Sequence, residues 1–309
     1  MPEAEKKNIF PDDLPLFLTE ELSRVYGPNE CLRIAQGYCS ERKSSLRTNR
    51  LKDGPDDTAL ALDELGVRFS RPDWYADAFV FDAGDEEKVR GSSLFTEGRI
   101  YLQNLSSMIP PLMTDFPEGC DVLDMCAAPG GKTTQIVSIT GGKVNVTACE
   151  NDRTRAERMK FNLSRQGCRT VNVLVTDSRR LDSFLKFDRI ILDAPCSGSG
   201  TVLAGDASTY RAISEKLAVN SSRLQKQLLR KGISMLKKGG VLVYSTCSVL
   251  PMENEDVLKE VLPGSNAEIV PFPDVLNGIP RIAGSIPEAL LVCPGEEHEG
   301  FFSAVIRKT

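Results

Sequence analysis

Short apolar segments alternate with longer amphipathic ones from about residue 119 onward, which is typical of strand–helix units built around a mainly parallel sheet. In the longest amphipathic segment, 214–236, apolar residues recur on roughly one face of a helix. The predicted strands are Asp121–Met125, Val144–Cys149, Val171–Val175, Arg189–Asp193 and Val241–Ser245, and the predicted helices are Lys132–Ser138, Arg153–Gln166, Ser214–Leu236 and Glu253–Val261. A further strand, Phe301–Ile306, is expected to join the sheet edge. The pattern predicts an α/β fold of the Rossmann-like, doubly wound type.

The first 95 residues follow a different pattern and predict a small α/β unit. The expected elements are helices at Leu14–Tyr26 and Asp56–Leu65 and extended segments at 45–51 and 68–81. An acidic, turn-rich stretch at 82–87 favours a boundary shortly after it. We therefore expect a small unit over residues 1–95 and a larger domain over residues 96–309.

Composition limits the class of protein. The chain has 309 residues, of which 41% are hydrophobic and 26% charged, values that allow a folded core. No apolar run approaches the roughly 20 residues that cross a bilayer. Residues 1–9 are charged and lack the apolar core of a signal peptide, so secretion is not expected. The net charge of −5 is unlike that of most nucleic-acid-binding proteins, so any RNA partner must meet a locally basic surface.

The cysteines and the single histidine narrow the chemistry. Nine cysteines without zinc-type spacing are typical of reduced thiols in the cytoplasm, and no metal site is expected. One histidine, His298, leaves almost no material for a Ser-His-Asp triad or a multi-histidine metal site. We expect His298 at the surface or in a turn.

A glycine-rich turn joins the first predicted strand of the larger domain to the helix that follows. It runs from Cys126 to Lys132 and places Gly130 and Gly131 where a backbone can approach a ligand at a helix N-terminus. Its spacing differs from that of a Walker loop and from the dinucleotide fingerprint. The turn predicts a nucleotide-like cofactor that carries a carboxylate, with a plain tight strand–helix turn as the alternative.

Acidic residues follow three successive predicted strands. Glu150, Asp177 and Asp193 lie at or just beyond the carboxyl ends of these strands, where open α/β sheets bind ligands. A carboxylate there can accept hydrogen bonds from ribose hydroxyls or an adenine amino group. Each acid taken alone could equally be a solvated loop residue or a helix cap.

Two cysteines occupy similar positions after two other strand ends. Cys196 lies in Asp193-Ala-Pro-Cys-Ser-Gly-Ser-Gly, and Cys247 lies in Tyr244-Ser-Thr-Cys-Ser. If the two strands are neighbours, about 4.8 Å apart, both thiols face one cleft. The alternatives are two buried structural cysteines or a disulfide, which a cytoplasmic location disfavours.

A thiolate beside an adenosyl cofactor suits methylation of cytosine at carbon 5. Carbon 5 is a poor nucleophile until a thiolate adds to carbon 6, which is a form of nucleophilic catalysis. An acid near ring nitrogen 3 would stabilise the charge that develops, and Asp193 is placed for this if it carries or donates a proton. A base must later remove the carbon 5 proton, and a second thiol could assist release.

These motifs together closely resemble the NOL1/NOP2/Sun family of RNA cytosine-5 methyltransferases. The resemblance rests on residues 125–134, 193–200 and 244–248, on Pro251-Met-Glu-Asn-Glu, and on similar segments at 45–49, 101–108 and 300–307. It implies Cys247 as the attacking nucleophile and Cys196 as the residue that helps release the product. It implies S-adenosylmethionine as cofactor, held by Cys126, Ala127, Ala128, Pro129, Gly130, Gly131, Lys132, Glu150, Asp177 and Asp193.

The expected partner is a structured RNA, either ribosomal or transfer RNA, bound by a cytoplasmic monomer without membrane or metal. Two basic clusters could neutralise phosphates, with a solvated charged face as the alternative. They consist of Arg42, Lys43, Arg47, Arg50 and Lys52, and of Arg179 with Arg180. Trp74 and Tyr75 could stack on a base but fit a core equally well. Rival functions are a non-catalytic RNA-binding factor and a methyltransferase acting on protein or a small molecule.

Overall fold

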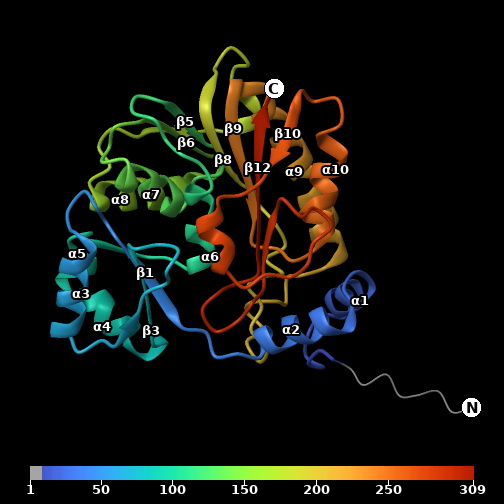
Figure 1. Ribbon diagram of the computed structural model, residues 1–309, viewed down its shortest axis with the longest axis horizontal. Coiled ribbons are helices and arrows are strands. Elements are labelled where there is room, and N and C mark those ends of the chain that lie inside the picture. The colour runs from blue at the N-terminus through green and yellow to red at the C-terminus, as the bar shows by residue number, and fades with distance from the viewer. Residues whose placement is uncertain (1–8) are drawn as a thin grey trace, which may run out of the picture.

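The computed structural model describes residues 9–309 and contains two sheets, one large and one small (Figure 1). Residues 1–8, which make up most of the segment tested above for a signal peptide, lie outside the described residues. The large sheet has the strand order β10-β12-β9-β8-β5-β6-β7, with β11 paired to β12. Its strands are β5 Asp121–Asp124, β6 Asn145–Glu150, β7 Asn172–Val175, β8 Phe187–Asp193, β9 Leu236–Thr246, β10 Ala267–Val270, β11 Leu290–Val292 and β12 Phe301–Lys308.

Strands β5 to β9 are parallel and confirm the alternating strand–helix prediction. The chain runs from β5 outward to β6 and β7, and then returns to add β8 and β9 on the other side. Such a reversal of strand order creates a crevice at the carboxyl ends of the strands, where α/β sheets bind ligands. The Rossmann-like α/β class predicted from the sequence is therefore confirmed.

Helices cover the sheet on both sides (Figure 1). In Figure 1, α7 and α8 lie together on one side, and α9 and α10 on the other. Helix α8 begins and ends at the predicted residues because Asp152 caps its N-terminus and the left-handed Gly167 ends it. The bounds are α6 Leu105–Met108, α7 Gly131–Ile139, α8 Arg153–Gln166, α9 Glu215–Met235 and α10 Glu255–Val261, with short 3-10 turns at η2 Pro110–Leu112, η3 Ser178–Arg180, η4 Pro251–Glu253 and η5 Asp274–Gly278.

A small antiparallel sheet with the order β2-β3-β1-β4 lies beside the α7–α8 side of the domain (Figure 1). Its own core contains Leu46, Phe79, Phe81 and Ile100, all buried. The elements are β1 Ser44–Thr48, β2 Phe69–Ser70, β3 Ala78–Phe81, β4 Ile100–Leu102, α3 Pro55–Glu64, η1 Ala83–Asp85, α4 Glu86–Gly91 and α5 Ser93–Thr96.

The first two helices pack with the large domain. Helices α1, Leu16–Val25, and α2, Pro28–Tyr38, share one core cluster with residues of β8, β9 and α9. Strand β4 follows the boundary expected at residues 95 and 96 but pairs with β1 of the small sheet. The boundary at residues 95 and 96 stays a prediction. By their contacts, α1 and α2 pack with the large sheet, and β4 belongs to the small sheet.

Strand β12 differs from the sequence prediction, because it lies inside the sheet. It pairs antiparallel with β9 on one side and with β10 on the other. The edge position is taken by β10, a four-residue strand too short to give a clear period-2 pattern. Among residues 9–309, no helix has the length and apolarity of a membrane span.

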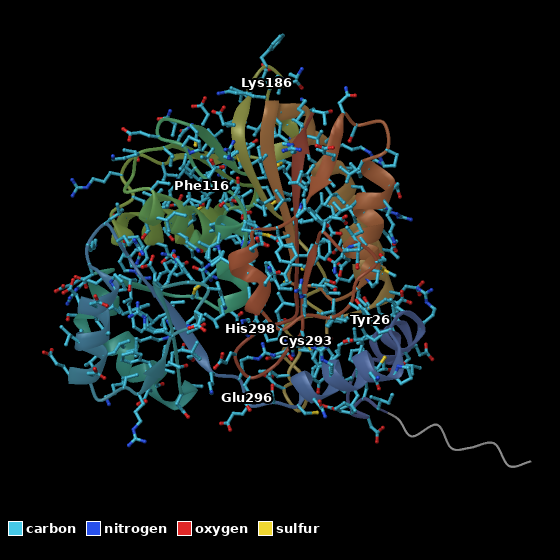
Figure 2. The ribbon with its side chains drawn as sticks, viewed as in Figure 1. Tyr26, Phe116, Lys186, Cys293, Glu296 and His298 are labelled. Carbon is cyan, nitrogen blue, oxygen red and sulfur yellow. The ribbon has the colours of Figure 1, made fainter. Side chains whose placement is uncertain are left out.

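The sequence predicted His298 at the surface or in a turn. His298 lies in a loop, but it is not at the surface. Figure 2 places its label near that of Glu296, between the small unit and α2, and only 7% of the residue is exposed. The Trp74 ring lies 6.3 Å away, and Trp74 and Tyr75 are themselves buried in the core. Burial, together with the nearby Arg42 charge, lowers the pKa of His298 to about 4.

This lowered pKa predicts an acid-dependent loss of stability. Between about pH 6.5 and pH 4, the unfolded chain binds a proton at His298 that the folded chain does not, so acid favours unfolding. Because His298 is the only histidine, His298→Gln should remove this contribution, which reaches about 1.4 kcal/mol per pH unit. Urea unfolding of both proteins at pH 7, 6 and 5 measures it. Parallel pH profiles for the two proteins would contradict the assignment.

Candidate active site

The site forms where neighbouring parallel strands end at the same edge of the large sheet. Asp193 of β8 pairs with Ser245 of β9, so the two chains leave the sheet at one level. Cys196 and Cys247 follow within three residues of these positions. Their sulfur atoms lie 3.1 Å apart, and both side chains are half-buried. The two thiols therefore lie together, as the sequence predicted.

The two sulfur atoms are free thiols, which removes the disulfide alternative. Their separation is well beyond a disulfide bond of about 2.05 Å. The hydrogen bond with Cys247, burial and the negative charge of Glu253 raise the pKa of Cys196 well above its usual value. A proton therefore stays on Cys196 more readily than on an ordinary exposed cysteine.

Backbone contacts extend the pairing of β8 and β9 into the cysteine loops. Gly200 N donates to Cys247 O at 3.0 Å, and the hydroxyls of Ser199 and Ser248 lie 2.8 Å apart. Gly200 also lies against Gly300, and a Cβ atom on Gly200 would come within 1.8 Å of the Gly300 carbonyl oxygen. This close approach explains why glycine is needed at the end of the Cys196 loop.

Two tyrosines of the N-terminal helices support the same loops from behind. The Tyr26 hydroxyl, labelled in Figure 2, donates to Val249 O at 2.7 Å. The Tyr38 hydroxyl donates to Ser199 O at 2.6 Å. Both tyrosines are buried, so α1 and α2 fix the backbone that carries the thiols.

One pocket, named here the Glu150 pocket, joins two of the predicted acids to the start of the glycine-rich turn. Glu150 is 3% exposed, and its Oε1 accepts from Asp152 N at 3.0 Å. Its Oε2 has no hydrogen-bond partner, although Arg155 Nη1 lies 3.4 Å away. A buried acceptor without a donor fits a ligand that supplies hydroxyl groups. The pocket is lined by Met125, Cys126, Glu150, Asn151, Arg155, Thr176, Asp177, Ser178, Arg179, Pro195, Leu224 and Leu228.

Asp177 lines this pocket as an ion pair. Arg179 Nη2 lies 2.6 Å from Asp177 Oδ2, and its guanidinium also reaches Gln227 on α9. The hydrogen bond from Arg179 is the main cause that lowers the pKa of Asp177. Arg179, expected to meet phosphate, is thus paired with Asp177 at the pocket wall, although it is exposed, as Arg180 is.

A second hollow, named here the Lys132 groove, lies on the other side of Cys126, which lines both. Lys132 is 8% exposed, and its Nζ donates to Asp193 Oδ2 at 2.7 Å and to Ser107 Oγ at 2.8 Å. Asp193 Oδ1 also accepts from Ser245 Oγ at 2.8 Å. The groove is lined by Tyr101, Leu102, Gln103, Asn104, Ser107, Asp124, Cys126, Ala127, Ala128, Pro129, Gly131, Lys132, Asp193 and Glu299.

The glycine-rich turn has the backbone that its sequence predicts. Gly130 has a φ of 101°, in the left-handed region that favours glycine, and helix α7 begins at the next residue. The turn lines the groove and reaches the pocket through Cys126, and the Thr133 hydroxyl anchors α7 by donating to Asp124 Oδ2 at 2.6 Å. Burial raises the pKa of Asp124 to about 6.

The predicted role of Arg47 in a phosphate-binding basic cluster is wrong. Its exposed fraction is 0%, so it cannot neutralise a phosphate. Instead its guanidinium donates to Gln103 Oε1 at 2.9 Å, Gly131 O at 2.8 Å and Thr134 Oγ1 at 2.7 Å. Arg47 therefore ties the small unit to the glycine-rich turn.

The other members of the cluster are also bound within the protein to different degrees. Arg50 donates to Asp77, and Lys52 Nζ donates to backbone carbonyl oxygens of Glu97 and Arg165. Lys43 lies on the surface within 3.7 Å of Glu296 and Glu297. These contacts engage Arg50 and Lys52, and Arg42 lies 3.8 Å from Glu299, whereas Lys43 stays exposed.

Sequence reasoning missed several residues of the site. Ser107 lies within the 101–108 segment of the family resemblance, but the segment alone does not show that its hydroxyl meets Lys132. Leu224 and Leu228 were predicted as one apolar face of a helix, and they line the Glu150 pocket. Glu253 had no assigned role, yet it is fully buried between the cysteine loops.

Comparisons with known proteins agree with this geometry. A family model described as 16S rRNA methyltransferase RsmB/F matches residues 112–307. Ribosomal RNA small subunit methyltransferase F of Shewanella sp. (strain W3-18-1) is 33% identical over 282 residues, which cover 86% of this chain and 57% of that protein. The chain thus spans little more than half the length of this relative.

Solved structures are similar over almost the whole chain. A methyltransferase homologue from Pyrococcus horikoshii is 32% identical with a TM-score of 0.80 and covers 94% of each chain. NSun6 from Pyrococcus horikoshii has a TM-score of 0.83 at 20% identity, covering 97% of this chain and 99% of that one. The second likeness shows the shared fold.

The buried position of Arg47 predicts a large effect on stability. Arg47→Ala removes three hydrogen bonds from a charged group and should lower the free energy of unfolding by about 3 kcal/mol. Arg68→Ala, at an exposed arginine of the same unit, is the matched control and should stay within about 0.5 kcal/mol. Urea denaturation measures both, and equal effects would show that Arg47 does not join the two bodies.

Proposed function

We propose an activity for this chain from its family: it belongs to the 16S rRNA methyltransferase RsmB/F family, within the NOL1/NOP2/Sun group that its sequence predicted. The proposed activity is methylation of carbon 5 of a cytidine in structured RNA. The family description favours ribosomal RNA as the substrate. The observation that carries the proposal is the pair of thiols 3.1 Å apart, beside a glycine-rich turn and a pocket of carboxylates.

The residues present fit S-adenosylmethionine as cofactor. When bound, this cofactor supplies an electrophilic methyl group. Glu150, with its free Oε2, would accept hydrogen bonds from ribose hydroxyls, and Leu224 and Leu228 offer apolar surface to the adenine ring. The N-terminus of α7 and the turn Cys126–Lys132 would hold the carboxylate end.

Cys247 is the proposed nucleophile. Its thiolate forms a bond to carbon 6 of the cytosine, and the electron pair of the 5,6 double bond becomes available at carbon 5. Lys132 and Asp193, whose side chains lie 2.7 Å apart, are the groups proposed to stabilise the negative charge that develops on the ring. Because both Asp193 oxygens already accept hydrogen bonds, we assign the proton that reaches the ring to the ammonium of Lys132.

Cys196 is the proposed aid to product release. After a base has taken the proton of carbon 5, the bond between Cys247 and carbon 6 breaks and the electron pair returns to the sulfur. The Cys196 thiol, kept protonated by its surroundings, donates a hydrogen bond to that sulfur over 3.1 Å. The departing thiolate is thereby stabilised.

The Glu150 assignment predicts a loss of cofactor affinity. Glu150→Ala removes a charged acceptor, worth about 1.5–3 kcal/mol, and should raise the Kd for S-adenosylmethionine about 10- to 100-fold. Isothermal titration calorimetry measures the Kd directly. Glu157→Ala, at an exposed glutamate on α8 that pairs with Lys160, is the control and should bind normally. Unchanged affinity in Glu150→Ala would exclude the pocket as the cofactor site.

The two cysteines are expected to fail in different ways. Cys247→Ala should reduce methylation of ribosomal RNA more than 1,000-fold, because carbon 5 is then not activated, while cofactor affinity stays near that of the wild type. Cys196→Ala should instead accumulate a covalent protein–RNA adduct that survives denaturing electrophoresis. Labelled methyl donor and RNA with 5-fluorocytidine provide the readouts.

An exposed cysteine gives the control for these variants. Cys39→Ala changes a free thiol that lines neither the Glu150 pocket nor the Lys132 groove, so it should form a normal level of transient adduct. Near-normal turnover by Cys247→Ala would overturn the proposed mechanism. An adduct in Cys247→Ala and none in Cys196→Ala would reverse the two roles.

A further inference from the structure

A single buried carboxylate joins the two cysteine loops. Glu253 lies in η4, just after the Cys247 loop, and its exposed fraction is 0%. Its Oε1 accepts from Ser197 N at 2.7 Å, and its Oε2 accepts from Ser197 Oγ and Ser248 Oγ, both at 2.6 Å. Ser197 and Ser248 are the residues directly after Cys196 and Cys247. The Glu253 side chain is thus hydrogen-bonded to the residue that follows each thiol.

The bonds to Glu253 come from neutral donors. Within residues 9–309 it forms no ion pair, and burial raises its pKa although the serine hydrogen bonds oppose this. A buried carboxylate is costly unless its oxygens are well hydrogen-bonded, so its three donors must hold a defined geometry. The backbone carbonyl oxygen of Glu253 also accepts from the Tyr244 hydroxyl at 2.5 Å, which fixes the residue against β9.

The negative charge of Glu253 acts on the Cys196 thiol. It is one of the causes that raise the pKa of Cys196, after the hydrogen bond with Cys247 and burial. The titratable groups facing Cys196 are Cys247 and Tyr244 from the β9 side and Glu253 from η4. Glu253 is the one carboxylate of this set.

We propose that Glu253 is a positioning residue, which sets the spacing of the two sulfur atoms through Ser197 and Ser248 and places a carboxylate beside Cys196. It thereby gives two chemically identical side chains different surroundings. Being fully buried, it touches neither RNA nor cofactor. The assignment of the attacking role rests on the proposed function, but the effect on Cys196 does not.

The test replaces the carboxylate with an amide of the same shape. In a Cys247→Ser background, Glu253→Gln should move the pH midpoint of Cys196 alkylation by iodoacetamide down by about one unit. Below the midpoint this is a roughly tenfold faster reaction. Peptide mass spectrometry separates Cys196 from the other cysteines, and no RNA or cofactor is present. A change in access alone would alter the plateau rate at high pH and leave the midpoint in place.

A neighbouring glutamate provides the matched control. Glu255 is 2% exposed and has a raised pKa from burial, but its Oε1 accepts from Ser285 N, away from the cysteine loops. Glu255→Gln should leave the Cys196 midpoint unchanged. An unchanged midpoint in Glu253→Gln, or an equal shift in both variants, would overturn the proposal.

Two further variants keep the test decisive if Glu253→Gln does not fold. Ser197→Ala and Ser248→Ala each remove one hydroxyl from the carboxylate, and in enzyme with both cysteines each should lower kcat about tenfold with little change in KM for RNA. Equal loss in kcat and gain in KM would indicate general damage and count against positioning. If the midpoint shifts but the wild type does not methylate cytidine, the proposed function fails and this proposal stands.

Discussion

The parallel pairing of β8 with β9 is the contact on which the site depends. Because Asp193 and Ser245 are partners in this pairing, the two chains leave the sheet at one level and carry their cysteines to the same place. Ala194 N still donates to Ser245 O at 2.8 Å beyond the last paired residues, and Gly200 N then reaches Cys247 O. The hydrogen-bond ladder of the sheet is therefore continued by the loops. A change of strand order would separate the thiols without altering either motif.

Buried polar side chains hold this arrangement from several directions. Arg47 reaches from the small unit to the glycine-rich turn, Glu253 joins the cysteine loops, and Tyr26 and Tyr38 support those loops from α1 and α2. A polar group that loses water must find its partners in fixed positions, so such contacts specify geometry more strongly than apolar packing does. The small unit thus has a structural role toward the turn, whatever surface it offers to RNA.

The cations around the site are paired with carboxylates. Lys132, Arg179 and Arg155 all lie against carboxylates within the Glu150 pocket and the Lys132 groove. Of the arginines that the sequence suggested for phosphate contacts, Arg50 and Arg179 are paired with carboxylates in the same way. A net charge of −5 is consistent with a site whose cations are paired. The basic surface for RNA therefore has to be sought among exposed residues such as Arg180 and Lys43.

Much of the fold could be predicted because its signals are local. Helix α8 was predicted with the bounds that the structure has, and the five parallel strands were located by their apolar runs. Helix α2 was missed, although Pro28 after Gly27 marks its start and Cys31, Ile34, Ala35 and Tyr38 form its buried face. The position of β12 within the sheet could not be read, since pairing partners lie far apart in the chain.

The sequence by itself determined which chemical groups stand at the strand ends, because turn residues and apolar periodicity are properties of neighbouring positions. It placed Glu150, Asp193, Cys196 and Cys247 correctly at one edge of the sheet. Only the tertiary structure decided the distance of 3.1 Å between the sulfur atoms, the burial of Arg47 and the hydrogen bonds of Glu253 to the cysteine loops. These depend on strand order and on contacts across tens to hundreds of residues, for which no local pattern in the chain carries a signal.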